Sequence, residues 1–242
     1  MTLDQICLDY AASSPDEVCG LIIDDARLFP CRNIHPQPHE HFRIDPDDWL
    51  AAEDEGEITA VFHSHVDPMP VLSPADRAAQ VMTGLPWWLA CDGLLRKFRP
   101  VPHLLGRKFT HGELDCLSLF RDAYHLAGID FPDFERTNGW WLRGENLYLK
   151  NLEPTGFYQV DHASAQPGDV LILKPFAGAD PCHAMVLLDD GVVLHHSQAE
   201  YASRREPYRL AFVKQTHSIW RHQQCSNFDS RGIYADFSAR SH

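Results

Sequence analysis

The distribution of apolar residues over the first hundred positions predicts short helices and strands in alternation. In LDQICLDYAAS (3–13) apolar side chains recur at helical spacing, which indicates an amphipathic helix. VCGLII (18–23) and ITAVFHSH (58–65) are apolar, β-branched runs, so we expect two buried strands. LPWWLACDGLLRKF (85–98) predicts two further strands joined by an Asp-Gly hairpin turn.

Start and stop signals add two helices to this half of the chain. PDDWLAAEDEG (46–56) opens with Pro and acidic residues and ends on Gly, as helices often do. Ser73 is placed to cap a helix that begins at Pro74 and continues to about Gln80. The prolines of CRNIHPQPHEHFRID (31–45) predict a loop that leads to an edge strand.

The pattern changes near residue 100, where two prolines and a glycine interrupt any periodicity, as in a linker. DCLSLFRDAYHLAGI (115–129) predicts an amphipathic helix ended by Gly128. PGDVLIL (167–173) predicts a turn and a strand, and HAMVLLDDGVVLHHS (183–197) predicts a strand, a turn and a second strand. These elements indicate a second α+β region after the linker.

We therefore predict an α+β protein of two domains. We place an N-terminal α/β domain at residues 1–98, a linker at 99–104 and a second domain at 105–242. The chain has 242 residues, enough for each half to bury its own core. Its 44% hydrophobic and 23% charged residues are typical of a globular protein and argue against a disordered chain.

Charge and cysteine content narrow the class of protein. The formal net charge is -13, without a clustered basic stripe, so we expect no nucleic-acid partner. The 7 cysteines are odd in number and include no CxxC pair, which excludes a complete disulfide framework and indicates reduced thiols. Neither a signal peptide nor a membrane span is predicted, so we expect synthesis in a cytoplasm.

The stretch HSHVDPMPVLSPAD is a candidate metal site. Alternate residues of a strand share a face, so His63 and His65 can both bind one ion. Asp76, in the first turn of the next helix, points back toward them, and is better placed than Asp67, which follows a Pro-containing turn. The hydroxyl of Ser73 lies between and can orient an oxyanion. In a chain with 15 histidines, the same residues also fit an ordinary polar loop.

The spacing of His63, His65, Ser73 and Asp76 resembles the H-x-H-x7-S-x2-D signature of the JAMM (MPN+) metalloproteases. PDEVCGLI supplies Glu17 upstream, in a context similar to the family's Glu-x-x-Gly segment. The resemblance implies a JAMM/MPN-like domain with Zn²⁺ as cofactor, held by the two histidines and Asp76. It implies that Glu17 is the general base and that Ser73 stabilises the oxyanion.

Other polar residues compete for these roles. Asp16 is a rival for the general base, but it stands one residue off the family pattern. His35, His39, Glu40 and His41 form a cluster that lacks the H-E-x-x-H order of a zincin helix. We interpret this cluster as a solvated loop that forms a lip over the cleft.

A second candidate site centres on Cys116, which begins the predicted helix of the second half. The helix N-terminus favours a thiolate, and a thiolate nucleophile needs a base such as His. His183 begins one strand of the later hairpin. If the hairpin is centred on Asp189, His195 lies opposite His183. If Asp190 and Gly191 instead form a two-residue turn, His196 shares the face of His183. The residues alone leave both registers open.

Three blocks of the sequence resemble the NlpC/P60 cysteine peptidases, a papain-like family that acts on cell-wall peptides. These blocks are GELDCLSLFRDAY, QPGDVLIL and HAMVLLDDGVVLHH. The resemblance implies that Cys116 is the nucleophile, His183 the general base and His195 the residue that orients the imidazole. It favours the register centred on Asp189. Asp115 precedes the nucleophile as in the family, whereas the small residue usual after the cysteine is replaced by a leucine.

The order and size of the two domains are similar to a family of tail-tip proteins from long-tailed phages and prophages. The resemblance implies a cysteine endopeptidase that cleaves peptidoglycan stem-peptide amide bonds during genome entry. It also implies a zinc-dependent peptidase or isopeptidase acting on the wall or on a tail protein. Other tail-tip proteins would be partners. The protein would be made in the host cytoplasm and act from the virion tail tip in the host periplasm or envelope.

Two alternatives to this function remain. The chain can be a structural or assembly component of the tail tip in which one or both active sites are unused. It can also be an isopeptidase for ubiquitin-like proteins outside phages, which the second domain disfavours. For the last residues, from HSIWRHQQ onward, the sequence indicates no function.

Overall fold

The computed structural model describes residues 1–197 and 202–240, and the chain divides into two compact units, Met1–Val101 and a second from Pro102 onward. Each unit combines helices with one sheet, which confirms the predicted α+β class. Within the described ranges, no helix is both long enough and apolar enough to cross a bilayer.

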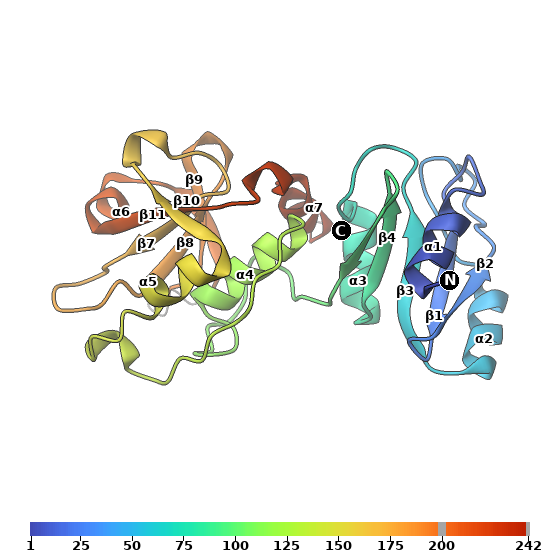
Figure 1. Ribbon diagram of the computed structural model, residues 1–242, viewed down its shortest axis with the longest axis horizontal. Helices are drawn as coiled ribbons and strands as arrows, with labels where there is room; N and C mark the ends of the chain where they lie inside the picture. Colours follow the sequence, from blue (N-terminus) through green and yellow to red (C-terminus); the bar gives the residue numbers. More distant parts are fainter. Residues whose placement is uncertain (198–201, 241–242) are drawn as a thin grey trace. The chain divides into compact units, whose positions relative to one another are not determined.

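The first unit is built on a five-stranded sheet in the order β2-β1-β3-β4-β5, in which only β3 and β4 run parallel (Figure 1). Its strands are β1 (Cys19–Ile23), β2 (Arg27–Cys31), β3 (Ile58–Ser64), β4 (Trp87–Cys91) and β5 (Leu94–Phe98). Its helices are α1 (Leu3–Ala11), α2 (Pro46–Glu55) and α3 (Pro74–Thr83).

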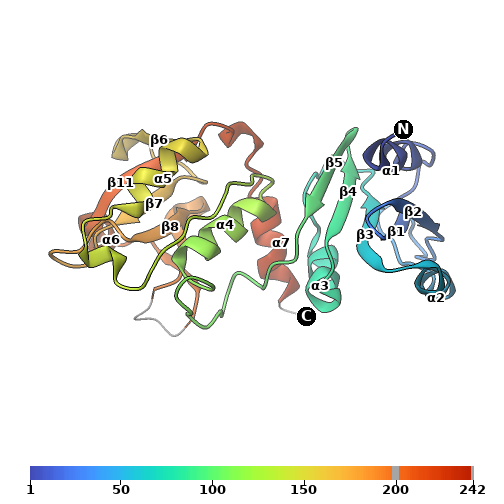
Figure 2. The ribbon, with the colours of Figure 1, turned by 60° about the horizontal axis from the view of Figure 1, so that its bottom comes forward.

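The alternation of side chains along the strands distributes two cores over the two faces of this sheet. Leu21 and Ile23 of β1 pack in one cluster with Ala52 of α2 and with Ala79 of α3. Ile22, between them, packs on the other side with Cys7 of α1. Helix α1 therefore covers one face, and α2 and α3 cover the other (Figure 2).

The edge strand of the first unit lies before the loop at 31–45 and not after it, which corrects the sequence expectation. Strand β2 follows a tight turn at Asp24 and Asp25, whose φ angles are 54° and 53°, and pairs with β1. The loop itself holds only an isolated bridge between Asn33 and Ile44. The hairpin was missed because its turn carries no glycine, although Asp also tolerates positive φ.

The helix signals of this unit are confirmed. Asp45 caps α2, which ends at Gly56, and Ser73 caps α3, which continues past the expected end to Thr83. Ser73 and Asp76 form a capping box, in which the side chain of each accepts the backbone N–H of the other. This box fixes the direction in which the Asp76 carboxylate points.

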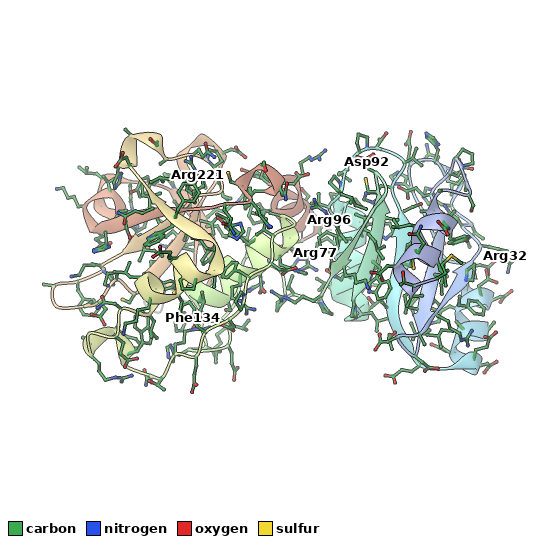
Figure 3. The ribbon with its side chains drawn as sticks, viewed as in Figure 1. Arg32, Arg77, Asp92, Arg96, Phe134 and Arg221 are labelled. Atoms are coloured by element: carbon green, nitrogen blue, oxygen red, sulfur yellow. The ribbon has the colours of Figure 1, made fainter. Side chains whose placement is uncertain are left out.

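A buried arginine ties α3 to the end of the unit. Arg77, labelled in Figure 3, is fully buried and donates from Nη1 to Gln80 Oε1 (2.8 Å) and from Nη2 to the Val101 carbonyl (2.5 Å). Gln80 Nε2 donates in turn to the Phe98 carbonyl (2.9 Å). The start of α3, which carries Asp76, is thereby held against strand β5 and the segment that follows it.

The second unit is an antiparallel six-stranded sheet in the order β10-β9-β8-β7-β11-β6, with α4 packed on β8 and β9. Its strands are β6 (Phe157–Val160), β7 (Val170–Leu173), β8 (His183–Leu187), β9 (Val192–His195), β10 (Arg204–Pro207) and β11 (Thr216–His222). Its helices are α4 (Cys116–Leu126), α5 (Leu147–Leu152), α6 (Leu210–Gln215) and α7 (Arg231–Ala239).

The C-terminal part of the chain, for which the sequence indicated no function, belongs to the framework of this unit. Strand β11 lies inside the sheet between β7 and β6, and α7 packs against α4. Arg221 of β11, labelled in Figure 3, forms a two-pronged ion pair with Asp169, with both N–O distances at 2.8 Å. This segment therefore stabilises helix α4, which carries Cys116, and the sheet, which carries His183.

The register of the β8–β9 hairpin differs from both sequence alternatives. Met185 lies opposite His195, so the hairpin is centred on Asp190 rather than on Asp189, and a 3-10 turn joins the strands instead of a two-residue turn. Moving the centre by one residue shifts the opposite position by two. His195 therefore keeps the face of His183 and lies diagonal to it, so the register was wrong while the shared face was right.

Candidate active sites

His63, His65 and Asp76 converge in the first unit. His65 Nε2 lies 3.2 Å from His63 Nε2 and 3.2 Å from Asp76 Oδ2, and His63 Nε2 lies 3.4 Å from the same oxygen. Two ligand atoms bound tetrahedrally at ~2.0 Å from a zinc ion lie ~3.3 Å apart. The three side chains are thus spaced as three ligands of one tetrahedral ion, with the fourth position left for water.

Contacts around the histidines orient their nitrogens. His65 Nδ1 donates to the Met69 carbonyl (2.7 Å), which leaves the lone pair of Nε2 for a cation. The ring of His63 is fully buried and stacks on Phe42 at 4.7 Å between centroids. The sequence did not indicate Phe42 or Met69, because both act through position and not through a recognisable motif.

The electrostatics of the cluster are those of a cation site. Burial lowers the pKa of His63, so this imidazole is neutral and can act as a ligand. Burial opposes ionisation of Asp76, but the two imidazoles outweigh it and hold the carboxyl pKa far below its usual range. Burial also lowers the pKa of His65, but the Asp76 carboxylate outweighs this and raises it. The carboxylate is therefore ionised between two histidines.

Glu17 and Ser73 line the cavity of about 490 Å³ at this cluster, together with His65 and Asp76. Burial, and then the charge of Asp76, raise the pKa of Glu17 to about 7. The Ser73 oxygen accepts the Asp76 N–H (3.2 Å), which leaves the hydroxyl hydrogen free to donate. The structure thus brings the five residues predicted for this site together.

The histidine-rich loop forms the other wall of this cavity. His35, His39, Glu40 and His41 all line it, in agreement with the predicted lip. Asp16, the rival to Glu17, is not among the described residues that line the cavity, and its carboxylate lies 3.6 Å from His39 Nδ1.

A single asparagine organises this lip. Asn33 Nδ2 donates to the carbonyls of Glu17 (2.9 Å) and His41 (3.0 Å). Asn33 Oδ1 accepts the N–H groups of His35 and Arg43, both at 3.0 Å. All four hydrogen-bonding positions of the amide are used, so the loop is fastened to the backbone of Glu17. Sequence reasoning missed Asn33, which stands in an unremarkable position between two predicted elements.

We predict that the purified protein binds one zinc ion per chain and that His63→Ala and Asp76→Asn weaken this binding. The loss of zinc affinity should exceed roughly 100-fold. Substitutions of residues that only contact a metal ligand already cost up to about 100-fold in metal affinity. Competition with a chromophoric chelator measures the affinity. His39→Ala, which alters the lip alone, is the matched control and should bind zinc as the wild type does. Equal affinity in all variants would contradict the assignment.

Cys116 occupies the first position of α4 in the second unit. The Asp115 carboxylate caps the helix by accepting the N–H groups of Leu117 and Ser118, both at 3.1 Å. Cys116, His183 and His195 line one cavity of about 500 Å³. The aromatic residues of its walls are Phe109, Trp140, Trp141, Tyr148, Phe176 and Phe212.

Three neighbouring strands form a polar relay behind this cavity. His183 Nε2 of β8 lies 3.2 Å from His195 Nδ1 of β9, and His195 Nε2 lies 2.7 Å from Glu206 Oε1 of β10. Arg204 and Arg209 each approach the same carboxylate to 2.9 Å. Sequence reasoning found the two histidines but missed Glu206, because β10 carries no clear strand pattern.

His196, the alternative partner of His183, has a different position. It is fully buried and lies edge-on to Phe109 at 5.2 Å between ring centroids. The relay runs through His195, as the family resemblance implied.

The sulfur of Cys116 has a partner that the sequence did not reveal. Cys116 Sγ lies 3.2 Å from the hydroxyl of Tyr148, a buried residue of α5, and 3.8 Å from the Cys182 carbonyl. Burial, and then the charge of Asp115, raise the pKa of Cys116 to about 11. Burial, followed by His195 and His196, lowers the pKa of His183 to about 3. At neutral pH the thiol and the imidazole are therefore both neutral at rest.

Comparison with known proteins agrees with the division of the chain into two units. Residues 2–100 match the family model of the prokaryotic homologs of the JAB domain, and residues 106–221 match that of the NlpC/P60 family. Tail tip assembly protein K of Escherichia phage lambda is 53% identical over 198 residues, which cover 82% of this chain and 98% of that protein. Tail tip assembly protein K of Escherichia phage N15 is 35% identical over 236 residues, covering 92% and 94%.

Two solved structures are similar at a low level. An NlpC/P60 family protein from Bacillus cereus is 13% identical, with a TM-score of 0.38, over 88% of this chain and 66% of its own. The peptidoglycan hydrolase RipB from Mycobacterium tuberculosis is 22% identical, with a TM-score of 0.30, over 44% of each chain. Scores this low add nothing to the assignment.

The two folds and their polar clusters define a protein with a JAB-like domain followed by an NlpC/P60 domain. At 53% identity over nearly the whole of a relative, the chain belongs to the phage tail tip assembly protein K family.

Proposed function

We propose that this protein is a two-domain hydrolase of the phage tail tip, in which the second unit is a cysteine endopeptidase. The observation that carries the proposal is the arrangement of Cys116, His183 and His195 in one cavity, with a relay to Glu206 behind them. The NlpC/P60 membership supports peptidoglycan stem peptides as substrate, because that family acts on cell-wall peptides. The amide bond would be cleaved during genome entry.

The relay assigns a role to each nitrogen of His183. Its Nε2 faces His195, so Nδ1 is left to take the proton of the Cys116 thiol. The sulfur then attacks the amide carbon, and the same proton passes to the leaving amine. Water, deprotonated by His183, hydrolyses the thioester. His195, held by Glu206, fixes the ring and stabilises the imidazolium that forms.

Within this mechanism Tyr148 supplies a hydrogen-bond donor at the reacting atom. Its hydroxyl contacts the sulfur at 3.2 Å, so it can stabilise the thiolate as the proton leaves. Its own pKa is raised well above the usual value, first by burial and then by Cys116, so the phenol keeps its proton. Tyr148 therefore favours the charged form of the nucleophile over the resting thiol.

We predict that Cys116→Ala abolishes release of muropeptide fragments from purified peptidoglycan, with a loss of roughly 1,000-fold or more, since the nucleophile is removed. Mass spectrometry of the digests measures the products and identifies the bond. Cys225→Ala changes another partly exposed thiol that does not line this cavity and should retain full activity. Wild-type levels of digestion by Cys116→Ala would refute the cysteine mechanism.

We predict that Tyr148→Phe reduces the turnover number by roughly 10-fold or more and leaves KM almost unchanged. The reason is that a hydrogen bond to a charged atom contributes about 1.5–3 kcal/mol. The matched control is Tyr124→Phe, which removes another buried hydroxyl, one that donates to the Gly168 carbonyl away from the sulfur. If both variants lose activity equally, the effect of Tyr148 is one of folding.

For the first unit we propose a zinc-dependent peptidase or isopeptidase that acts on a tail protein or on the wall. His63, His65 and Asp76 would hold Zn²⁺, whose Lewis acidity makes a water molecule a stronger acid and polarises a carbonyl group. Glu17 takes the proton from the attacking water and passes it to the leaving amine. The Ser73 hydroxyl, which has a free hydrogen, donates to the oxyanion.

We predict that Glu17→Gln retains zinc but loses hydrolysis by roughly 100-fold or more, because general-base catalysis is removed while the ligands remain. Zinc content and cleavage of peptidoglycan and of purified tail-tip proteins are measured in parallel. Asp16→Asn is the control, since this neighbouring carboxylate does not line the cavity. Loss of zinc from Glu17→Gln would show that Glu17 is needed for the site itself and would overturn its role as base.

The names of the relatives favour a location on the virion and a second candidate function. Both relatives are called tail tip assembly protein, so we propose that the chain acts with other tail-tip proteins on the virion and reaches the host envelope at infection. The alternative is an assembly component with one or both sites unused. Virions that carry Cys116→Ala together with His63→Ala would assemble and infect normally under that alternative, and would assemble but infect poorly under the hydrolase proposal.

A further inference from the structure

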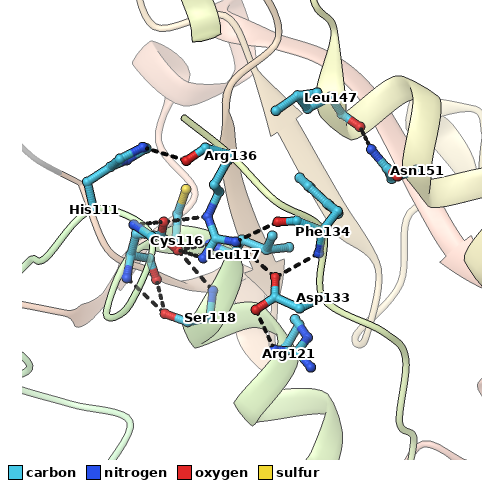
Figure 4. Close-up of polar contacts among 12 residues, drawn as sticks. His111, Cys116, Leu117, Ser118, Arg121, Asp133, Phe134, Arg136, Leu147 and Asn151 are labelled. Carbon is cyan, nitrogen blue, oxygen red and sulfur yellow. Dashed lines mark hydrogen bonds and ion pairs between the residues drawn. The ribbon is translucent and has the colours of Figure 1, made fainter. Parts of the chain in front are cut away.

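Figure 4 shows a dense network of polar contacts beside Cys116, in which Arg136 and Asp133 take part. The carboxylate of Asp115 is the centre of this network. Besides the two N–H groups of the first turn of α4, it accepts the N–H of Gly112 at 2.9 Å. Arg136 binds it in a two-pronged ion pair, with Nε 2.6 Å from Oδ2 and Nη2 2.9 Å from Oδ1. The side chains of both partners are almost completely buried, with exposed fractions of 5% and 3%.

Arg136 belongs to a segment that is fastened to α4 at a second point. Its Nη1 donates to Asp133 Oδ1 (2.9 Å) and to the Phe134 carbonyl (3.0 Å). Asp133 Oδ2 lies 2.9 Å from Nη1 of Arg121, a residue of α4 itself. The carbonyl of Arg136 lies 3.2 Å from His111 Nε2, at the wall of the cavity. The guanidinium is therefore held at one place relative to the start of the helix.

Three other titratable groups on the cavity wall, Tyr148, Cys182 and His183, carry no charge at neutral pH. Burial raises the pKa of Tyr148 well above its usual value, raises that of Cys182 to about 12, and lowers that of His183 to about 3. His111 lies on the cavity wall and bonds the Arg136 carbonyl. Asp115 and Arg136 are charged groups that act on Cys116, and they act with opposite sign.

The two charges have opposite effects on the nucleophile. A carboxylate at the N-cap stabilises α4, but it repels a negative charge on the sulfur of the next residue. The guanidinium of Arg136 cancels that repulsion without removing the cap. Its planar fork also satisfies both carboxylate oxygens at once, which a lysine ammonium cannot do.

We infer that Arg136 is a positioning residue of the cysteine site. It neutralises the Asp115 cap and fixes the first turn of α4, so that the Cys116 sulfur can become negatively charged in the cavity. The inference rests on the proposed cysteine endopeptidase for its functional meaning. Its physical content is independent of that function, because it concerns the acidity of one thiol.

The test is the pH dependence of Cys116 alkylation by iodoacetamide, followed by peptide mass spectrometry so that the other cysteines do not interfere. Arg136→Gln should slow alkylation at a fixed pH near neutrality by about 10-fold or more, since one pKa unit is a factor of ten in thiolate. Asp115→Asn should accelerate it by a similar factor. The double variant should return close to the wild-type profile, and Arg136→Lys should lie between wild type and Arg136→Gln.

A merely structural role gives a different pattern. In that case Arg136→Gln and Asp115→Asn break the same contact and shift the profile in the same direction, which would overturn the inference. If Arg136→Gln fails to fold, Asp115→Asn and the double variant still decide, because only the electrostatic role gives acceleration in the first and its cancellation in the second. Arg143→Gln is the matched control: it removes a neighbouring arginine that pairs with Glu145 and should leave the profile unchanged.

The outcome also separates this inference from the proposed function. If Cys116→Ala still digests peptidoglycan while the alkylation pattern holds, the hydrolase mechanism fails and the role of Arg136 stands. If Cys116→Ala is inactive and the two single variants shift alkylation in the same direction, the hydrolase stands and the role of Arg136 fails.

Discussion

The two candidate sites, at His63 and at Cys116, depend on one constraint. A helix N-terminus needs side-chain hydrogen-bond acceptors for its first N–H groups. The first N–H groups of a helix have no partner within the helix, and in α3 and α4 they are satisfied by capping boxes. In α3 the cap is Ser73 and the third residue is Asp76; in α4 the cap is Asp115 and the third residue is Ser118. The same exchange of hydrogen bonds fixes the proposed metal ligand Asp76 in one unit and the residue beside the proposed nucleophile in the other.

Burial then determines where the protons reside. It raises the pKa of Glu17 to about 7 and that of Cys116 to about 11, and lowers that of His183 to about 3. A carboxyl group near neutrality exchanges protons in both directions, which suits Glu17 to its proposed role. In the second unit the resting pair is neutral, so in the proposed mechanism charge would separate when the thiol proton passes to His183. Tyr148 and Arg136, the groups proposed to stabilise this charge, would therefore raise the fraction of thiolate that can attack.

The parts of the structure that were predicted correctly are those with a local signal. The cap at Ser73, the start of α2 at Pro46, the strand that carries His63, and the start of α4 at Cys116 follow from neighbouring residues in the sequence. The family spacing then selected the residues that the structure brings together at each cavity.

What was missed acts over long distances in the chain. Asn33, Tyr148 and Glu206 reach the sites through elements whose position depends on the whole sheet or on a loop path. The register of the β8–β9 hairpin was wrong because it depends on the geometry of a 3-10 turn, which composition does not specify. Only the shared face, which depends on odd and even positions, could be predicted.

The two capping boxes also explain why the second site has an arginine paired with its helix cap. In α3 the cap is the neutral Ser73, and the anion Asp76 is itself aimed at the histidines, where a bound cation would compensate its charge. In α4 the anion is the cap, and in the proposed mechanism the neighbouring sulfur would become an anion as well. Two negative charges at one helix start require a cation that does not compete for the sulfur's own partners. Arg136 meets this requirement because its guanidinium donates to Asp115, Asp133 and the Phe134 carbonyl, and the described residues show no bond from it to Cys116.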